Sequence, residues 1–358
     1  MTLIRGQDIQ EAARWLMNGQ LVAFPTETVY GLGANARDEQ AIEAVYRAKG
    51  RPGNHPVIVH VAAAQDVSAW AVGIDERARL LMEHFWPGPL TLILPKRAEV
   101  SARITGGQDT VAVRCPAHPT AQALLHAFAQ LWGPGAGVIA PSANRFGQVS
   151  PTQADHVFDE FVDVPHTSMY LLEGEAAQVG IESTIVDLSN AQQWPRILRP
   201  GQIQAQELSQ VLGSPVYDFM AMPSDSRPLE QSTEPRVSGS LKAHYAPQTP
   251  LFLFSRHELT QITSVQSLPK EQRIACVSCG PWQRAEGVPG AVPAAISSSV
   301  VHVEELPRDP QRYAQLLYAT LRRLDKQGYD ALWFEQPPAH ASWAGVNDRL
   351  RRAAAAFS

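Results

Sequence analysis

The sequence predicts a two-domain protein of the mixed α/β, or α+β, class. Three observations support this prediction. The chain has 358 residues, which is more than one hydrophobic core usually serves. Short apolar runs alternate with stretches of helical periodicity through the first 200 residues. Between residues 215 and 250 the chain becomes rich in proline and polar residues, which is typical of a connection between domains.

The first half of the chain opens with a helix and a strand. Residues 8–19 place apolar side chains on one helical face, with Asp8 able to cap the helix and Gly19 able to end it. The apolar run 21–24 is a short strand stopped by a proline, and the turn-rich stretch 26–35 follows it. The same patterns predict helices at 38–48 and 121–131, and strands at 57–61, 90–94, 110–114, 138–140, 170–172, 183–188 and 196–198.

The second half is predicted to be a small, Rossmann-like α/β domain. An apolar stripe marks the long helix of this domain and is expected to face its core: Tyr313, Leu316, Leu317, Leu321 and Leu324. The expected elements are strands at 251–254, 273–279 and 330–334, and helices at 310–326 and from about 346 to the end. We therefore expect a first domain at 1–201, a proline-rich linker at 202–249 and a second domain at 250–358.

Composition narrows the class of protein. Hydrophobic residues make up 44% and charged residues 18%, as in ordinary globular proteins. The net charge of −5 argues against a broad electrostatic surface for RNA. The three cysteines are too few for a disulfide framework, and Cys276 and Cys279 lie in an apolar strand without further metal ligands nearby. No signal-like segment and no run of 18 apolar residues is present, so we expect a cytoplasmic protein without a membrane span.

Polar and special residues cluster at the ends of the predicted strands of the first domain, where ligand sites of α/β proteins lie. Lys49 and Arg51 stand two apart in a turn and can face one anion, with Arg51 suited to bidentate recognition and Lys49 to a point charge. The clusters occupy residues 25–33, 49–52, 110–114, 141–145, 150–152, 182–184 and 198–201.

Each cluster alone also has an ordinary structural interpretation. Lys-Gly-Arg is a common helix end, Ser-Ala-Asn is a common turn, Arg114 could be a surface charge, and His60 could be a core histidine. The run GLGANA at 31–36 formally matches the dinucleotide-binding fingerprint. However, six residues separate its first glycine from the end of the predicted strand at 21–24, whereas the fingerprint needs a tight turn directly after the strand. No Walker A lysine motif is present, so any ATP would be held without a P-loop.

Taken together, the clusters resemble the YrdC-like threonylcarbamoyl-AMP synthases, in the long form that carries an extra C-terminal domain. The matching strings occur in family order and span residues 8–247. They are PTETVYGLGANA, KGRPGNHPVIVH, WPGPLTLIL, TVAVRCP, APSANRFGQVSPT, GIESTIVD, ILRPG and HYAP.

The resemblance implies a fold, a reaction and partners. The fold is a twisted mixed sheet with helices around a positive, concave cavity in the catalytic domain. The reaction joins L-threonine, bicarbonate or carbon dioxide, and ATP with Mg²⁺, and yields threonylcarbamoyl-AMP and pyrophosphate. Partner proteins then transfer the threonylcarbamoyl group to an adenosine beside the tRNA anticodon, so direct contact of this chain with tRNA would be weak at most. The resemblance implies no metal ligand from the protein itself.

The resemblance also assigns roles to individual residues. The catalytic tetrad corresponds to Lys49, Arg51, Ser142 and Asn144. The ATP contacts correspond to Arg51, His55, Thr110, Ser142, Ser150, Arg199 and Tyr245, with His55 standing where many members have Asn. The L-threonine contacts correspond to Thr28, His60, Arg114, Ala140 and Ser183, with Arg114 as the clamp on the carboxylate. Because Tyr245 lies far along the chain, we expect the linker to fold back over the cavity as a lid.

Other functions remain open on the residues alone. One alternative is a non-catalytic RNA-binding module, which would show a steep salt dependence. The other is a different α/β enzyme, such as a nicotinamide oxidoreductase or a carbamoyltransferase.

Overall fold

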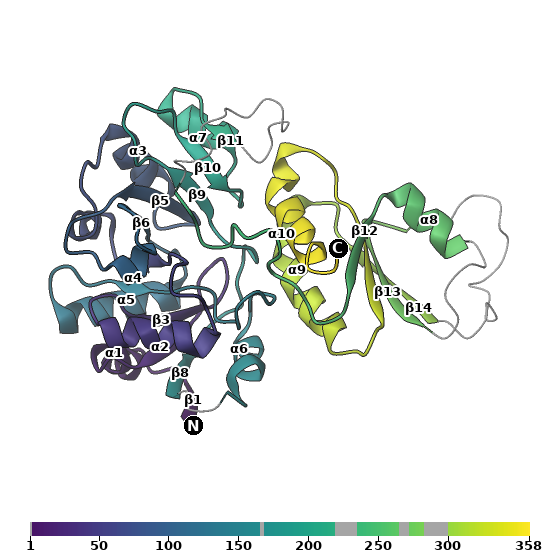
Figure 1. The fold of residues 1–358 in the computed structure, drawn as a ribbon, viewed down its shortest axis with the longest axis horizontal. Coiled ribbons are helices and arrows are strands. Elements are labelled where there is room, and N and C mark those ends of the chain that lie inside the picture. Colours follow the sequence, from purple (N-terminus) through teal and green to yellow (C-terminus); the bar gives the residue numbers. More distant parts are fainter. Residues whose placement is uncertain (1, 165–167, 219–234, 265–271, 283–299) are drawn as a thin grey trace. The chain divides into compact units, whose positions relative to one another are not determined.

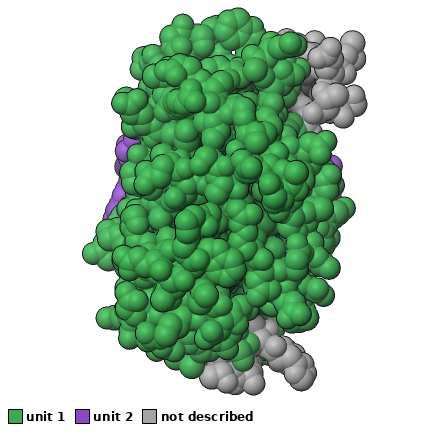
Figure 2. All heavy atoms as spheres, turned by 90° about the vertical axis from the view of Figure 1, so that its left-hand side faces the viewer, with its two compact units in different colours: residues 1–146, 150–240 green, residues 147–149, 241–358 purple. Residues whose placement is uncertain are grey.

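The computed structural model describes residues 2–164, 168–218, 235–264, 272–282 and 300–358 (Figure 1). The chain folds into two compact units, which Figure 2 distinguishes by colour. Unit 1 comprises residues 1–146 and 150–240, and unit 2 comprises residues 147–149 and 241–358. The change from unit 1 to unit 2 after Ser240 falls inside the segment that the sequence predicts as a linker.

In the described part of unit 1, the strands form one eleven-stranded mixed sheet, as the sequence predicts for the class. The strand order is β1-β8-β2-β3-β7-β4-β6-β5-β9-β10-β11. The strands are β1 (Thr2–Gly6), β2 (Leu21–Phe24), β3 (Gly31–Asn35), β4 (Ile58–His60), β5 (Leu90–Pro95), β6 (Thr110–Arg114), β7 (Val138–Ile139), β8 (Ser168–Leu172), β9 (Thr184–Asp187), β10 (Arg196–Arg199) and β11 (Tyr217–Asp218). The helices are α1 (Ile9–Met17), α2 (Glu39–Lys49), α3 (Glu76–Phe85), α4 (Ala102–Thr105), α5 (Pro119–Trp132), α6 (Ala154–Phe161) and α7 (Ala205–Leu212).

Two apolar clusters cover the two faces of the sheet. Along β2, Val22 and Phe24 belong to the cluster that α1 and α5 help to form, whereas Leu21 and Ala23 belong to the cluster that includes α2 and α3. This division follows from the alternation of side chains along a strand. The central strands are therefore buried on both sides, which explains why strands such as β2 (LVAF) are continuous apolar runs in the sequence.

The helix caps explain where α1 and α2 begin and end. The Asp8 side chain accepts hydrogen bonds from the backbone N–H groups of Gln10 (2.8 Å) and Glu11 (3.0 Å) and so starts α1, as predicted. Helix α2 ends at Gly50, whose φ of 60° is left-handed. This turn fixes the direction of the chain between Lys49 and Arg51, the two predicted cations.

Strand β3 differs from the turn-rich stretch that the sequence predicts for 26–35. It pairs antiparallel with β2, and Gly33 lies so close to that strand that a Cβ atom would meet the Phe24 ring at 2.8 Å and the Val22 carbonyl oxygen at 2.9 Å. The glycines that indicate a turn in the sequence therefore permit a close strand pairing instead. Because residues 31–35 are a strand, they cannot form the phosphate-binding turn of a dinucleotide site.

Several elements of unit 1 are absent from the sequence prediction: β1, α3, α4, α6, α7 and β11. Helix α7 and strand β11 lie inside the predicted linker, where β11 pairs in parallel with β10 and α7 buries Leu208. The prolines at 223 and 228 of the predicted linker lie outside the described residues.

The described part of unit 2 contains a four-stranded parallel sheet in the order β12-β15-β13-β14. Its elements are β12 (Leu251–Phe254), α8 (Arg256–Ser264), β13 (Arg273–Cys279), β14 (Val300–Leu306), α9 (Pro310–Asp325), β15 (Ala331–Glu335) and α10 (Ala344–Ala354). The predicted stripe of α9 is buried except at Leu316, which is half-buried. Cys276 and Cys279 are free thiols in the buried strand β13. None of the described helices combines the length and the apolar character needed to cross a membrane.

Candidate active site

Parallel strands β4 and β6 bring two predicted amino-acid contacts side by side. Their register pairs His60 with Arg114 at the carboxyl ends of both strands. The Arg114 guanidinium is buried and donates hydrogen bonds to the Thr28 hydroxyl (2.8 Å) and to the Gly88 carbonyl (3.2 Å). Its Nη2 atom lies 2.7 Å from Oε1 of Glu27. Arg114 is therefore not a surface charge, and the structure joins it to Thr28, another residue that the resemblance assigns to the amino-acid site.

The loop that carries Thr28 is held by its own side chains. The Thr26 hydroxyl donates to the Val29 carbonyl (2.6 Å) and accepts from the backbone N–H groups of Thr28 and Val29, both at 3.2 Å. The hydroxyl groups of Thr26 and Thr28 share a further hydrogen bond of 2.8 Å. This ST-turn network fixes the Thr28 hydroxyl toward Arg114.

His60 is a buried, uncharged imidazole. Its side chain is 2% exposed, and burial together with the positive charge of Arg114 lowers the pKa of His60 to about 3. His60 can therefore act at neutral pH through hydrogen bonding but not through a positive charge.

Backbone hydrogen bonds join the Thr28 loop to the segment with the predicted Ser142 and Asn144. Tyr30 N–H donates to the Pro151 carbonyl (2.8 Å), and Ala143 N–H donates to the Tyr30 carbonyl (2.8 Å). Ala140, a predicted amino-acid contact, lies beside Gly31, where a Cβ atom would meet its methyl group at 3.0 Å.

Lys49 organises the turn that carries Ser142 and Asn144. The side chain is 2% exposed, and its ammonium donates to the backbone carbonyl of Ser142 (2.5 Å) and to that of Asn144. The Asn144 amide in turn donates to the Arg145 carbonyl (2.7 Å). The structure thus brings three of the four predicted catalytic residues into direct contact.

Arg51 and Arg199 meet at Ser238. Arg51 donates to the Ser238 hydroxyl (3.4 Å) and to the Pro56 carbonyl (2.8 Å), and Arg199 donates to the Ser238 carbonyl (2.9 Å). Arg199 also donates to the hydroxyl (3.1 Å) and the carbonyl (3.0 Å) of Ser183. Two predicted nucleotide contacts therefore converge with one predicted amino-acid contact.

The remaining predicted nucleotide contacts of unit 1 lie around this point. The Ser150 hydroxyl donates to Oε1 of buried Glu182 (2.5 Å). The His55 ring lies 5.3 Å from the Phe146 ring, and burial together with Arg51 lowers the pKa of His55. Thr110 lines the pocket described next.

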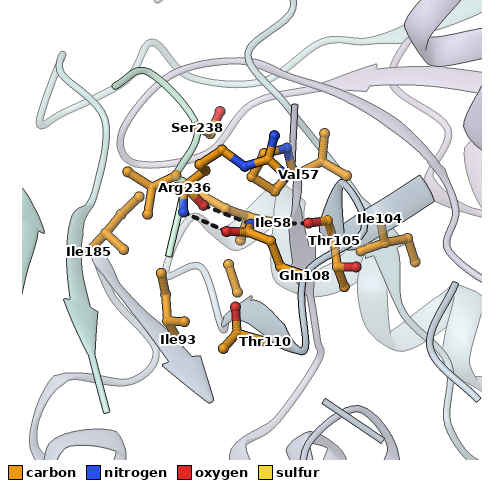
Figure 3. Close-up of a pocket in the computed structure, with 13 residues that line it drawn as sticks. Val57, Ile58, Ile93, Ile104, Thr105, Gln108, Thr110, Ile185, Arg236 and Ser238 are labelled. Carbon is orange, nitrogen blue, oxygen red and sulfur yellow. Dashed lines mark hydrogen bonds between the residues drawn. The ribbon is translucent and has the colours of Figure 1, made fainter. Parts of the chain in front are cut away.

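A small, mostly apolar pocket lies beside these residues (Figure 3). Residues 236–238 of the predicted linker line it together with Thr110, and Val237 packs there against Ile58, Ile93 and Ile185. The Gln108 amide clamps the segment, because it accepts from the Arg236 N–H (2.6 Å) and donates to the Arg236 carbonyl (3.1 Å), as Figure 3 shows.

Tyr245, the last predicted nucleotide contact, belongs to unit 2. It is 1% exposed, has a left-handed φ of 61°, and stacks on Tyr318 at a ring distance of 5.9 Å. Its predicted role as part of a lid stays a prediction.

Four residues of this network are absent from the predicted site: Glu27, Gln108, Glu182 and Ser238. Glu27 and Glu182 lie inside clusters that the sequence singles out, so position alone could have suggested them. Gln108 and Ser238 carry no sequence signal, because their partners are distant in the chain. Among the described residues, no group of three or more His, Cys, Asp or Glu side chains could hold a metal ion.

Two family models together match most of the chain. The Sua5/YciO/YrdC model, described as "Telomere recombination", matches residues 14–201. A second model, described as "Threonylcarbamoyl-AMP synthase, C-terminal domain", matches residues 203–355.

Curated relatives and solved structures agree with these matches. A threonylcarbamoyl-AMP synthase of Pyrococcus abyssi is 35% identical over 96% of this chain and 93% of its own length. One of Bacillus subtilis is 36% identical over 97% and 92%. The crystal structure of P. abyssi Sua5 complexed with L-threonine is 32% identical, has a TM-score of 0.80, and is matched over 99% of this chain and 97% of that chain.

Proposed function

The chain belongs to the Sua5/YciO/YrdC family and carries the C-terminal domain of threonylcarbamoyl-AMP synthases, and from this premise we propose its reaction. The enzyme joins L-threonine, bicarbonate or carbon dioxide, and ATP, and it releases threonylcarbamoyl-AMP and pyrophosphate. The product then serves the modification of tRNA beside the anticodon.

One contact of the site supports this assignment above the others. Arg199, a nucleotide contact by resemblance, donates to the hydroxyl of Ser183, an amino-acid contact by resemblance, at 3.1 Å. The two subsites must adjoin, because the carbamate formed on the amino group has to reach the α-phosphate. A reaction between two bound substrates gains most from such proximity.

In the proposed reaction, separate sets of side chains bind the amino acid and the nucleotide. Arg114 binds the amino-acid carboxylate, with Thr28, His60, Ala140 and Ser183 shaping the rest of its subsite. A second set binds the nucleotide: Arg51, His55, Thr110, Ser142, Ser150 and Arg199, joined by Tyr245 from the linker as a lid.

Attack on the α-phosphate builds negative charge there. Lys49, Arg51 and the polar groups of Ser142 and Asn144 stabilise this charge from fixed positions. Mg²⁺ enters with ATP as part of the substrate, and we assign it no protein ligand.

We further propose that the enzyme acts in the cytoplasm and passes its product to separate transfer proteins. The three cysteines are free thiols, which a reducing compartment favours. The net charge of −5 favours hand-over to partner proteins over strong binding of tRNA by this chain.

Pyrophosphate release by the purified full-length chain tests the proposal. With MgATP, L-threonine and bicarbonate we expect release, together with a labile adenylate identified by mass spectrometry. Omitting threonine or bicarbonate should abolish both signals. Serine should be the poorer substrate by about 1–3 kcal/mol, because it lacks one methyl group. Pyrophosphate release that stays the same when threonine and bicarbonate are omitted would show that the proposed reaction is wrong.

The alternative functions have their own signatures in separate assays. A nicotinamide oxidoreductase would change the absorption of its cofactor on titration. A carbamoyltransferase would depend on carbamoyl phosphate. An RNA-binding module would bind RNA tightly and lose affinity steeply with salt.

A further inference from the structure

The pair of Glu27 and Arg114 is buried and incompletely satisfied. Their side chains are 6% and 4% exposed, and Oε1 of Glu27 lies 2.7 Å from Nη2 of Arg114. The pair is not aligned as a hydrogen bond, so both carboxylate oxygens of Glu27 and Nη2 of Arg114 have no hydrogen-bond partner. Two of these three atoms face each other as an ion pair, whereas Oε2 of Glu27 has no partner. A buried polar atom without a partner costs about 1–3 kcal/mol, so this oxygen calls for an explanation.

The remaining bonds of Arg114 show that Glu27 is not needed to hold the guanidinium in place. Arg114 is already fixed from two other directions, by the Thr28 hydroxyl and the Gly88 carbonyl. Glu27 itself is anchored through its backbone, because Val179 N–H donates to the Glu27 carbonyl (2.7 Å). The carboxylate is thus held beside Arg114 while its own oxygens keep their capacity to accept.

The charges of Glu27 and Arg114 match those of a free amino acid. Arg114 contributes one positive charge and Glu27 one negative charge, and His60 is neutral because burial lowers its pKa to about 3. An α-amino acid carries its carboxylate and its ammonium on one carbon atom, so its two charges lie as close together as those of the protein pair. A simple carboxylic acid would satisfy Arg114 and leave Glu27 facing a like charge.

We propose that Glu27 is a specificity-determining residue, which accepts hydrogen bonds from the ammonium group of the amino-acid substrate while Arg114 holds its carboxylate. This inference rests on the proposed function. It assigns to Glu27 the selection of a zwitterion over an anion, a role distinct from bracing Arg114.

Calorimetric titration of the full-length chain with two ligands separates these roles. L-threonine carries the ammonium, and (2S,3R)-2,3-dihydroxybutyrate replaces it with a hydroxyl group at the same carbon. Glu27→Gln keeps the shape of the side chain and removes its charge. We expect this variant to bind L-threonine about 10- to 100-fold more weakly, the range of a lost hydrogen bond to a charged group. Its affinity for the hydroxy acid should stay unchanged or rise.

Asp187→Asn is the matched control, because Asp187 is also buried and also pairs with an arginine, Arg196, at 2.7 Å. This control should keep the wild-type ratio of the two affinities. Equal weakening of both ligands by Glu27→Gln would overturn the inference and leave Glu27 as a brace. If that variant does not fold, Glu27→Asp replaces it, and the same selective loss of threonine binding is required.

The affinities of the wild-type chain for the two ligands provide a further test. Wild-type chain that binds the hydroxy acid as tightly as L-threonine would overturn the inference about Glu27 alone. Failure of wild-type chain to bind either ligand would instead overturn the amino-acid site of the proposed function.

Discussion

Replacement of Lys49 by methionine tests the centre of the site most directly. The ammonium of Lys49 is buried and donates to the backbone carbonyls of Ser142 and Asn144. Methionine keeps the length and much of the volume of the side chain but offers no donor. The variant therefore removes one charge and leaves two carbonyl groups without these bonds, while it opens little space in the core.

The expected loss of stability follows from those two carbonyl groups. Each buried acceptor that loses its donor costs about 1–3 kcal/mol, so the free energy of unfolding should fall by about 2–6 kcal/mol. A domain in the middle or upper part of the ordinary range of about 5–15 kcal/mol would remain folded after such a loss. Turnover should fall about 30- to several-thousand-fold, because a charge in the role proposed for Lys49, facing the reacting phosphate, is worth about 2–5 kcal/mol.

Urea denaturation and pyrophosphate release measure the two effects on the same protein. Lys96→Met is the control, because the ammonium of Lys96 is half-buried and donates to a single carbonyl, that of Val100, at 3.3 Å. It should lose at most about 1 kcal/mol and keep its turnover. Wild-type stability of Lys49→Met would refute the argument from the two carbonyls. Wild-type turnover in the folded variant would refute the catalytic assignment of Lys49.

Three further predictions concern Arg51, Tyr245 and His60. Arg51→Ala should lose turnover by about 30-fold or more while remaining folded, and unchanged turnover would remove Arg51 from the site. A chain ended after Ser240 keeps unit 1 but lacks Tyr245, so we expect weaker ATP binding in calorimetry; an unchanged Kd would mean that Tyr245 is not a nucleotide contact. His60 has a folded pKa of about 3, against an ordinary value of 6.5, so the unfolded chain binds more protons between these pH values. The free energy of unfolding therefore falls as the pH falls from 6.5 toward 3. His60→Gln should reduce this pH dependence by up to about 1.4 kcal/mol per pH unit. An identical slope in wild type and variant would contradict the buried, neutral imidazole.

Local signals in the sequence predicted many of the strands and the helix caps, for a physical reason. The cap at Asp8 and the left-handed turn at Gly50 depend on residues only a few positions apart, so their signature is visible in a short string. Strand β6 was also visible, because its three central residues, Val111 to Val113, are apolar and both valines are buried.

Contacts between residues that are distant in the chain could not be predicted from the sequence. Gln108 and Arg236 are 128 residues apart, and neither has a neighbour in sequence that signals the amide clamp between them. The glycines of β3 indicated a turn, because the approach of Phe24 that requires them is visible only in the fold. Glu27 lay in one of the polar clusters, but its meaning depends on Arg114, which follows 87 positions later in the chain.

The packing of Val237 against the sheet of unit 1 bears on how fragments of this protein would behave in solution. Val237 covers an apolar patch made by Ile58, Ile93 and Ile185 on the sheet. A fragment that stops at residue 201 would expose this patch to water, and exposed patches of this kind promote self-association. Such a fragment also loses α7 and strand β11, so we expect poor solubility, and extending the fragment to residue 240 should restore a monodisperse protein.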